Sequence, residues 1–275
     1  LLRVGRRRAR GADRLLVGLM NLDRVTITGA DETVSPEALV ALSRAYPFVE
    51  WGVLVSAGRK SEPRYPSWRW VDRLLAAAPG ILLANTPCGI RLALHVCGRW
   101  ARALLRGDDY LSRDWPYVES FPRIQLNLPD GQPYNADALA EALTTISRRT
   151  MGGVQFIFQI HSGGRAAYLE AVWPAKDPAL DAVPLFDASG GRGVTPFAWP
   201  QPVYFVDPAT PAYHGYAGGL SPENLVAELP KIALAAGHAR IWIDMESGVR
   251  SEDAFDLDKV RRVLEIAAPH ITPTA

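Results

Sequence analysis

The 275-residue chain has few cysteines, no long apolar run and no large excess of charge of either sign. Two cysteines, Cys88 and Cys97, are too few for a disulfide framework or a cysteine-rich metal cluster, so we expect a reducing compartment, the cytoplasm. No apolar run reaches the roughly 20 residues that a membrane-spanning helix needs. The sequence therefore predicts no membrane partner, no bound metal and no cofactor.

Positive charge is concentrated at the N-terminus. Residues 1–19 contain six arginines and one aspartate, a net charge of +5 against +1 for the whole chain, so residues 20–275 carry −4. A mildly acidic body argues against nucleic acid as the partner. The first methionine is Met20, and the arginine-rich start does not have the pattern of a secretory signal. We expect residues 1–19 to be an upstream or fragment extension; the alternatives are a disordered basic tail and an anchor for anionic partners. Residues 20–275 are expected to form one domain.

Apolar, β-rich runs alternate with helical patterns along that domain. This alternation predicts a parallel sheet, and eight strands favour closure into a single (β/α)8 TIM barrel over an open doubly wound sheet. Ser35, Ser221 and Asp256 are expected to begin helices. The sixth unit lacks a clear helix, because residues 188–211 are rich in glycine and proline. The expected strands are 23–28, 48–55, 91–96, 122–128, 154–161, 182–187, 213–217 and 239–245; the expected helices are 36–45, 67–78, 98–106, 136–148, 164–171, 221–236 and 256–268.

Two segments in the last quarter of the chain each run from a strand through a glycine-containing turn into a helix. The turns contain Gly218-Gly219 and Ser247-Gly248. Paired turns after the seventh and eighth strands of a β/α barrel form a recurring phosphate site. Backbone N–H groups and helix N-termini attract the anion there. The sequence therefore predicts a phosphorylated small molecule as the ligand.

Polar residues at the C-terminal ends of the strands are the candidates for chemistry, because active sites of such barrels lie at that end. Asp187 ends the sixth strand directly before a glycine-rich loop, which can close over a ligand. This position favours a general acid or base over an ordinary loop cap. The other candidates at strand ends or in the second loop are Thr28, Arg64, Cys97, Asn127, His161, Asp244 and Glu246.

Longer motifs resemble those of phosphoribosylanthranilate isomerase, the β/α barrel of the tryptophan pathway, from about residue 24 to the end. Phe186-Asp187 and the following Gly190-Gly191-Arg192-Gly193-Val194-Thr195 resemble its sixth strand and loop. Residues 217–224 and 244–249 resemble its seventh and eighth phosphate turns. Pro63-Arg64-Tyr65 resembles its second loop, and Ile124-Gln125-Leu126-Asn127 is similar to its fourth strand, where Asn127 takes the place of the usual histidine.

The resemblance implies an Amadori rearrangement, the aldose-to-ketose isomerisation of a phosphorylated aminosugar, by a monomer or homodimer. Asp187 would protonate the ring oxygen, and Arg64 would meet the anthranilate carboxylate. The alternative is a catalytically inert or repurposed barrel that binds a phosphorylated metabolite. The remaining residues expected to contact the ligand are Asn127, Gly191, Gly193, Gly218, Gly219, Asp244, Ser247 and Gly248.

The sequence departs from the family at the residue that removes the proton from C2. Thr26-Ile27-Thr28-Gly29 stands where the family has Lys-Ile-Cys-Gly. A threonine hydroxyl does not act as a base unless an adjacent base activates it. Cys97, on the same strand face as His95, is a candidate for a relocated base, with a buried cysteine beside a core histidine as the alternative. His161 is a second candidate, with a helix-cap role as its alternative, and Asp31 is a third.

A second departure lies beside the expected phosphate. Glu246 stands where the family has a small serine. Its negative charge would repel a phosphate, so Glu246 is expected to point away or to pair with a cation such as Arg250.

Overall fold

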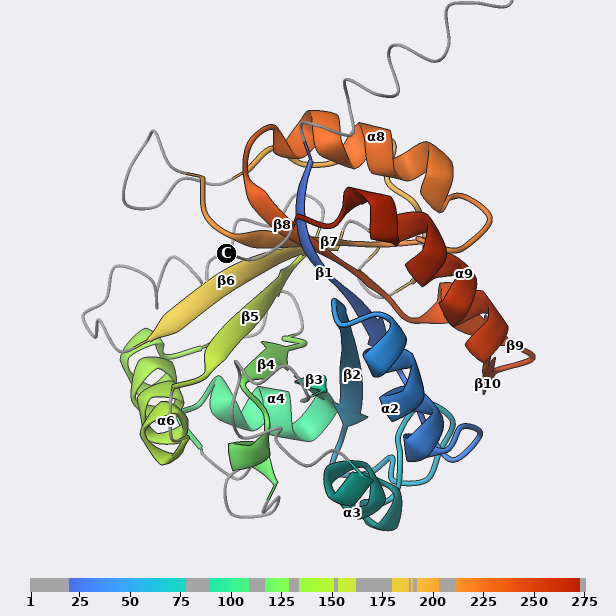
Figure 1. The fold of residues 1–275 in the computed structure, drawn as a ribbon. Helices are drawn as coiled ribbons and strands as arrows, with labels where there is room; N and C mark the ends of the chain where they lie inside the picture. Colours follow the sequence, from blue (N-terminus) through green and yellow to red (C-terminus); the bar gives the residue numbers. More distant parts are fainter. Residues whose placement is uncertain are drawn as a thin grey trace, which may run out of the picture.

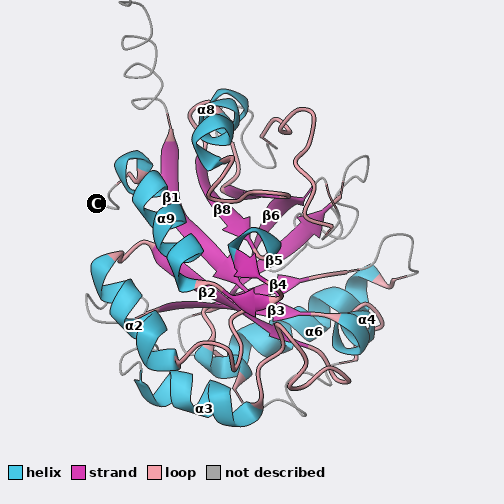
Figure 2. Ribbon diagram, turned by 90° about the vertical axis from the view of Figure 1, so that its right-hand side faces the viewer, coloured by secondary structure: helices cyan, strands magenta, loops and turns pink. Residues whose placement is uncertain are grey.

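The computed structural model is a closed barrel of eight parallel strands with helices on the outside (Figures 1 and 2). Neighbouring strands pair in chain order, and β1 closes the barrel against β8. The expected (β/α)8 TIM barrel is therefore confirmed. The strands are β1 (Asn21–Thr28), β2 (Val49–Val55), β3 (Arg91–Val96), β4 (Arg123–Leu126), β5 (Gln155–Ile160), β6 (Asp181–Asp187), β7 (His214–Ala217) and β8 (Arg240–Met245), with a short hairpin of β9 (Arg250–Ser251) and β10 (Ala254–Phe255) after the barrel.

Side-chain caps explain where several helices begin. Ser35 accepts a hydrogen bond from the amide of Ala38, and Asp256 accepts from two amides of its first turn, which confirms both expected starts. The third expected start was wrong, because α8 begins at Leu225 rather than at Ser221. The helices are α2 (Pro36–Ala45), α3 (Trp68–Ala77), α4 (Gly98–Leu104), α6 (Ala136–Arg149), α8 (Leu225–Ala236) and α9 (Leu257–Ala267), with 3-10 turns η1 (Val118–Ser120), η2 (Ser247–Val249) and η3 (Ala268–His270).

The late start of α8 has a local cause. The side chain of Asn224 accepts a hydrogen bond from the Ser221 amide and donates one to the Gly219 carbonyl. Residues 219–224 are thereby held as a turn, and Asn224 takes the cap position of the helix. The turn after β7 therefore reaches the cavity as irregular backbone and not as a helix end.

The structure describes residues 20–77, 90–108, 117–128, 134–150, 153–161, 180–187, 189, 192–202 and 211–272. The basic segment 1–19, the helix expected at 164–171 and Gly191 lie outside these ranges. In the long loop after β6, residues 192–202 contain neither helix nor strand, as expected. Within the described part of the chain, no helix is both long enough and apolar enough to cross a bilayer.

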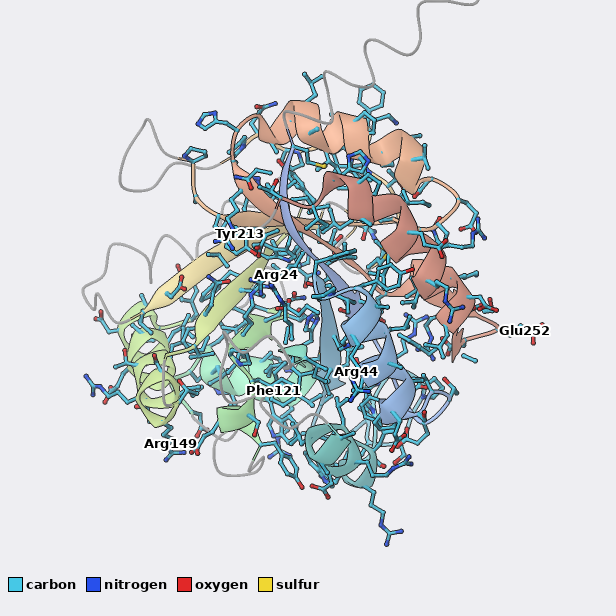
Figure 3. All side chains as sticks on the ribbon, in the orientation of Figure 1. Arg24, Arg44, Phe121, Arg149, Tyr213 and Glu252 are labelled. Carbon is cyan, nitrogen blue, oxygen red and sulfur yellow. The ribbon has the colours of Figure 1, made fainter. Side chains whose placement is uncertain are left out.

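Successive strand residues point alternately into the barrel and outward against the helices. Arg24 and Tyr213 lie within the barrel, whereas Arg149 and Glu252 extend from the outer surface (Figure 3). The larger apolar core lies between strands and helices. A smaller apolar cluster consists of inward-facing residues, namely Ile157, Val183, Leu185, Ala217 and Trp242.

Charged residues occupy the barrel interior toward the N-terminal ends of the strands. Glu50 is fully buried and accepts hydrogen bonds from Arg24 Nη1 at 2.8 Å, Thr26 Oγ1 at 2.9 Å and Arg123 Nη1 at 2.6 Å. Arg123 also lies over the ring of Trp242, 4.3 Å from its centroid. Burial alone would raise the pKa of Glu50, but the two arginines outweigh it and lower that pKa to about 2. This network of ion pairs and hydrogen bonds holds together the barrel interior on the N-terminal side of the functional site.

Candidate functional site

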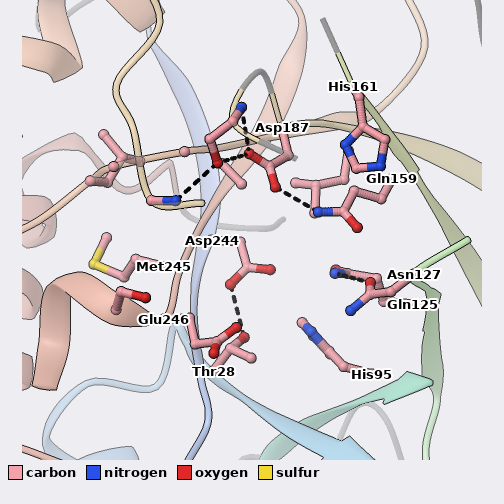
Figure 4. Close-up of a pocket in the computed structure, with 18 of the residues that line it drawn as sticks. Thr28, His95, Gln125, Asn127, Gln159, His161, Asp187, Asp244, Met245 and Glu246 are labelled. Atoms are coloured by element: carbon pink, nitrogen blue, oxygen red, sulfur yellow. Dashed lines mark hydrogen bonds between the residues drawn. The ribbon is translucent and has the colours of Figure 1, made fainter. Parts of the chain in front are cut away.

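A cavity of about 340 Å³ opens at the C-terminal ends of the strands, where sequence analysis places the chemistry (Figure 4). Thr28 and Asp244 line it from adjoining strands, and Asp187 lines it from β6. Arg64 and Cys97 are not among the lining residues. The other expected residues that line it are Asn127, His161, Gly193, Gly218, Gly219, Glu246, Ser247 and Gly248.

The carboxyl group of Asp187 is held in one orientation by three donors. Gln159 Nε2 donates to Oδ2 at 2.6 Å, and Ser189 donates to Oδ1 from both its amide, at 3.0 Å, and its hydroxyl, at 2.7 Å. The Ser189 hydroxyl also accepts from the amide of Gly193, at 3.1 Å. Ser189 and Gly193 thus link the loop after β6 to the carboxylate, and Asp187 is only 3% exposed.

A second carboxyl group, that of Asp244, points into the same cavity (Figure 4). Thr28 Oγ1 donates a hydrogen bond of 2.9 Å to Asp244 Oδ1. Burial, reinforced by the negative charges of Glu246, Glu50 and Asp187, raises the pKa of Asp244 to about 8, although the Thr28 hydrogen bond acts in the opposite direction. The site therefore contains two carboxyl groups in different surroundings, an arrangement that suits acid–base chemistry.

The turns after β7 and β8 present amide groups to the cavity. Gly218 and Gly219 have φ values of +115° and +63°, a conformation that glycine adopts without strain. Within the described residues, the amides of Gly219, Leu220 and Gly248 donate no hydrogen bond, yet all three residues line the cavity. Such unpaired backbone donors form an anion-binding concavity.

The glycines of these turns also allow close backbone packing. A Cβ atom at residue 219 would lie 2.3 Å from the Thr195 amide nitrogen, and one at residue 248 would lie 2.0 Å from the Leu220 carbonyl oxygen. Thr195 Oγ1 in turn donates to the Gly219 carbonyl at 3.2 Å. The loop after β6 is therefore docked on the turn after β7, and a larger residue at 219 would disturb that docking as well as any ligand.

Among the described residues that line the cavity, three further side-chain atoms have no hydrogen-bond partner: His95 Nε2, Gln125 Oε1 and His161 Nδ1. His95 is 1% exposed, and its burial lowers the pKa of the imidazole to about 3, so the ring is neutral. Buried polar atoms without partners are costly unless a ligand or water satisfies them. The cavity is thus suited to a ligand with several hydroxyl groups.

Cys97 does not have the surroundings of a catalytic base. Its thiol accepts a hydrogen bond from Asn127 Nδ2 at 3.1 Å, and burial raises the thiol pKa to about 11. A thiol in this state is protonated at neutral pH. Cys97 is half-buried, with its thiol against the His95 carbonyl at 3.8 Å, which is closer to the alternative of a structural cysteine beside a core histidine. Asn127 itself lines the cavity and also accepts from Gln125 Nε2, at 2.8 Å.

Arg64 is engaged differently from what the resemblance implies. Its guanidinium donates to Glu246 Oε1 at 2.7 Å, to Ser247 Oγ at 3.0 Å and to Asp253. The cation that pairs with Glu246 is therefore Arg64 and not Arg250, which is buried against Asp31 at 2.7 Å. Asp31 does not line the cavity, so its carboxylate has a structural role here.

Sequence reasoning missed several cavity residues, of which Arg102 of α4 is the most consequential. Arg102 is the one lysine or arginine among the described residues that line the cavity. It lies on the exposed side of a short helix, where no sequence pattern separates it from an ordinary surface arginine. Gln159 could have been found, since it shares the inward face of β5 with His161. Ser189 follows Asp187 by two residues, the spacing of a local side-chain turn.

Comparisons with known proteins agree with the architecture. No protein-family model and no curated protein matches the chain. The crystal structure of phosphoribosylanthranilate isomerase from Thermus thermophilus matches with a TM-score of 0.50 and 21% sequence identity, over 89% of this chain and 98% of that one. TrpF from Jonesia denitrificans matches with a TM-score of 0.53 and 16% identity, over 89% and 96%. At these identities the likeness shows that the chain shares the fold of these isomerases.

Proposed function

We propose that this protein is a divergent isomerase of the phosphoribosylanthranilate type, which converts a phosphorylated aminoaldose into the aminoketose. The observation that supports this most strongly is the position of Asp187. It lies at the end of β6, fixed by three donors, in a cavity that the unpaired amides of the β7 and β8 turns also line. An acid and an anion site in one cavity of about 340 Å³ match the two ends of a sugar phosphate.

Each part of such a substrate has a partner in the cavity. The phosphate would accept hydrogen bonds from the amides of Gly219 and Gly248. The sugar hydroxyls would satisfy the buried, unpaired His95 Nε2 and Gln125 Oε1. Because Arg64 is paired with Glu246, we assign recognition of the anthranilate carboxylate to Arg102.

The first chemical step uses Asp187 as the acid. The lone pair of the anthranilate nitrogen forms a C=N bond to C1, the bond between C1 and the ring oxygen breaks, and that oxygen takes the proton of Asp187. The product is an open-chain iminium ion. No electrons leave the substrate, so the reaction needs no redox partner. Such a step belongs to amino-acid biosynthesis in the cytoplasm, where we place the protein.

The direct experiment is turnover of phosphoribosylanthranilate by the purified chain, with the aminoketose separated by liquid chromatography. We expect Asp187→Asn to lower kcat by about 10²–10⁴-fold, the usual contribution of a general acid. Asp181→Asn is the matched control, because Asp181 begins the same strand at the opposite, exposed end. Full activity of Asp187→Asn would contradict the assignment. Growth of a tryptophan auxotroph that lacks the isomerase provides an independent test.

The absence of a cysteine at the end of β1 favours a second candidate, an inert barrel that binds a phosphorylated metabolite. The two functions differ in one measurement. A binding protein would bind ribose 5-phosphate in calorimetry and would not turn over the aminosugar, in the native chain or in any variant at Asp187.

A further inference from the structure

Thr28 occupies the end of β1, and its hydroxyl is engaged with a carboxyl group on the neighbouring strand. Thr28 Oγ1 donates to Asp244 Oδ1 at 2.9 Å, and β1 pairs with β8 along its length. Both side chains are buried, at 1% and 5% exposure, and both line the cavity. The hydroxyl proton is therefore directed at Asp244, and the hydroxyl orients that carboxyl group toward the ligand space.

We propose that Asp244 is the base that removes the proton from C2 of the substrate, and that Thr28 is its positioning residue. This inference rests on the isomerase function proposed above, and it assigns the step that the missing cysteine would otherwise perform. The carboxyl group adjoins the residue that replaces the cysteine, and Asp187 lines the same cavity from β6, two strands away (Figure 4).

The surroundings of Asp244 give a carboxylate the basicity that the step requires. An ordinary aspartate, with a pKa of about 3.9, is a weak base, whereas a cysteine thiolate has a pKa of about 8.5. Burial raises the pKa of Asp244 to about 8, together with the negative charges of Glu246, directly after β8, of Glu50 on β2, and of Asp187 on β6 once Asp187 has given up its proton. His95, which faces the cavity from β3, is neutral and adds no positive charge. The buried carboxylate is thus comparable in basicity to the thiolate it replaces.

The other candidate bases are less suitable. The thiol of Cys97 does not line the cavity and has a pKa of about 11. Asp31 is paired with Arg250 outside the cavity. His161 lines the cavity, but it lies beside Gln159 and Asp187, away from Thr28 (Figure 4).

The proton and electron movements balance with these two carboxyl groups alone. After Asp187 has protonated the ring oxygen, the Asp244 carboxylate takes the proton from C2. The C–H electron pair becomes the C1=C2 bond, and the π electrons of the C=N bond return to nitrogen, which gives an enolamine. Asp244 then returns its proton to C1 while the enol hydroxyl gives its proton to Asp187. The product is the ketose, and both groups regain their starting states.

The test measures turnover of phosphoribosylanthranilate by Asp244→Asn, alone and combined with Thr28→Cys. We expect Asp244→Asn to lower kcat by about 10²–10⁴-fold. Calorimetry should give a Kd for ribose 5-phosphate within about threefold of the native value, a difference of at most about 0.65 kcal/mol. Thr28→Cys in the Asp244→Asn background should recover at least about tenfold of the lost rate, because a thiolate can take the same proton. A merely structural loss would not be rescued by a new thiol.

The pH profile of kcat/KM gives a second readout. The rate should rise with pH as Asp244 ionises, with a limb near pH 8 that Asp244→Asn abolishes. Thr28→Val removes a hydrogen bond that lowers the pKa of Asp244, so the limb of the pH profile should move to higher pH. Glu246→Gln removes a negative charge that raises the pKa of Asp244, so the limb should move to lower pH. An unchanged limb in Asp244→Asn, or activity within threefold of native, overturns the assignment and leaves the isomerase function intact. No turnover by the native chain at any pH overturns both.

Discussion

Gly52 is the residue whose replacement tests the site most directly without touching a proposed catalytic group. Its position on β2 faces into the barrel beneath the cavity. A Cβ atom there would lie 2.2 Å from Thr28 Oγ1 and 2.8 Å from His95 Nε2. Carbon–oxygen contacts this short do not occur, so Gly52→Ala must displace the Thr28 hydroxyl and break its hydrogen bond to Asp244. Overpacking of this kind costs about 1–3 kcal/mol of folding free energy.

Gly58→Ala is the matched control, because no atom lies within 4 Å of the Cβ it would add. Urea unfolding should show a loss of about 1–3 kcal/mol for Gly52→Ala and a change within about 0.5 kcal/mol for Gly58→Ala. Turnover should fall in Gly52→Ala and not in Gly58→Ala. The limb of the kcat/KM profile of Gly52→Ala should also move to higher pH, as expected when Asp244 loses the hydrogen bond from Thr28.

A double-mutant cycle with Thr28→Ala identifies the source of the strain. Removing the Thr28 hydroxyl vacates the space, so Gly52→Ala should cost at least about 0.5 kcal/mol less in the Thr28→Ala background than in the native chain. Activity should stay low in the double variant, since Asp244 still lacks its hydrogen bond. Strict additivity of the two stability changes would refute the reasoning, because it would mean that the two side chains do not compete for space.

Three further outcomes follow from particular contacts. Glu50→Gln should lose about 3–5 kcal/mol of folding free energy in urea unfolding, because it leaves Arg123 buried without its carboxylate; a loss below 1 kcal/mol would contradict this. Because the pKa of Glu50 is lowered to about 2, the stability that its charge supplies to the native chain is present above about pH 4 and is lost as the pH falls toward 2. Arg102→Met should raise KM about tenfold with kcat nearly unchanged in steady-state kinetics, as expected for a group that only binds; an unchanged KM would exclude Arg102 from carboxylate recognition. Ser247→Asp should weaken ribose 5-phosphate binding at least about tenfold in calorimetry, because the new carboxylate places a negative charge beside the amide of Gly248. The control Ser61→Asp, on the exposed second loop, should leave the Kd for ribose 5-phosphate unchanged.

Most of the fold could be predicted from the sequence because strand and helix patterns are local. The expected strand near 91–96 and helix near 36–45 coincide with β3 and α2. The error at Ser221 came from a competing local interaction. A Ser-Pro-Glu sequence favours a helix start, but the side chain of Asn224 forms hydrogen bonds that fix a turn instead.

The sequence by itself determined the alternation of strands and helices, favoured a barrel over an open sheet, and placed polar residues at the C-terminal ends of the strands. Strand periodicity requires no knowledge of distant residues, and a parallel barrel always brings the strand ends together. The position of Asp187 at the end of the sixth strand, before a glycine-rich loop, was therefore enough to make it a candidate acid.

Only the tertiary structure decided how charges and hydroxyls are paired across strands. Arg64 and Glu246 are 182 residues apart, and Thr28 and Asp244 are 216 apart, so no spacing rule connects either pair. The pKa of Asp244 depends on burial and on charges that lie on or directly after three different strands, and these come together only after the barrel has closed. The sequence shows that a cysteine is missing at the end of β1, but only closure of β1 against β8 brings a carboxyl group to the threonine that replaces it.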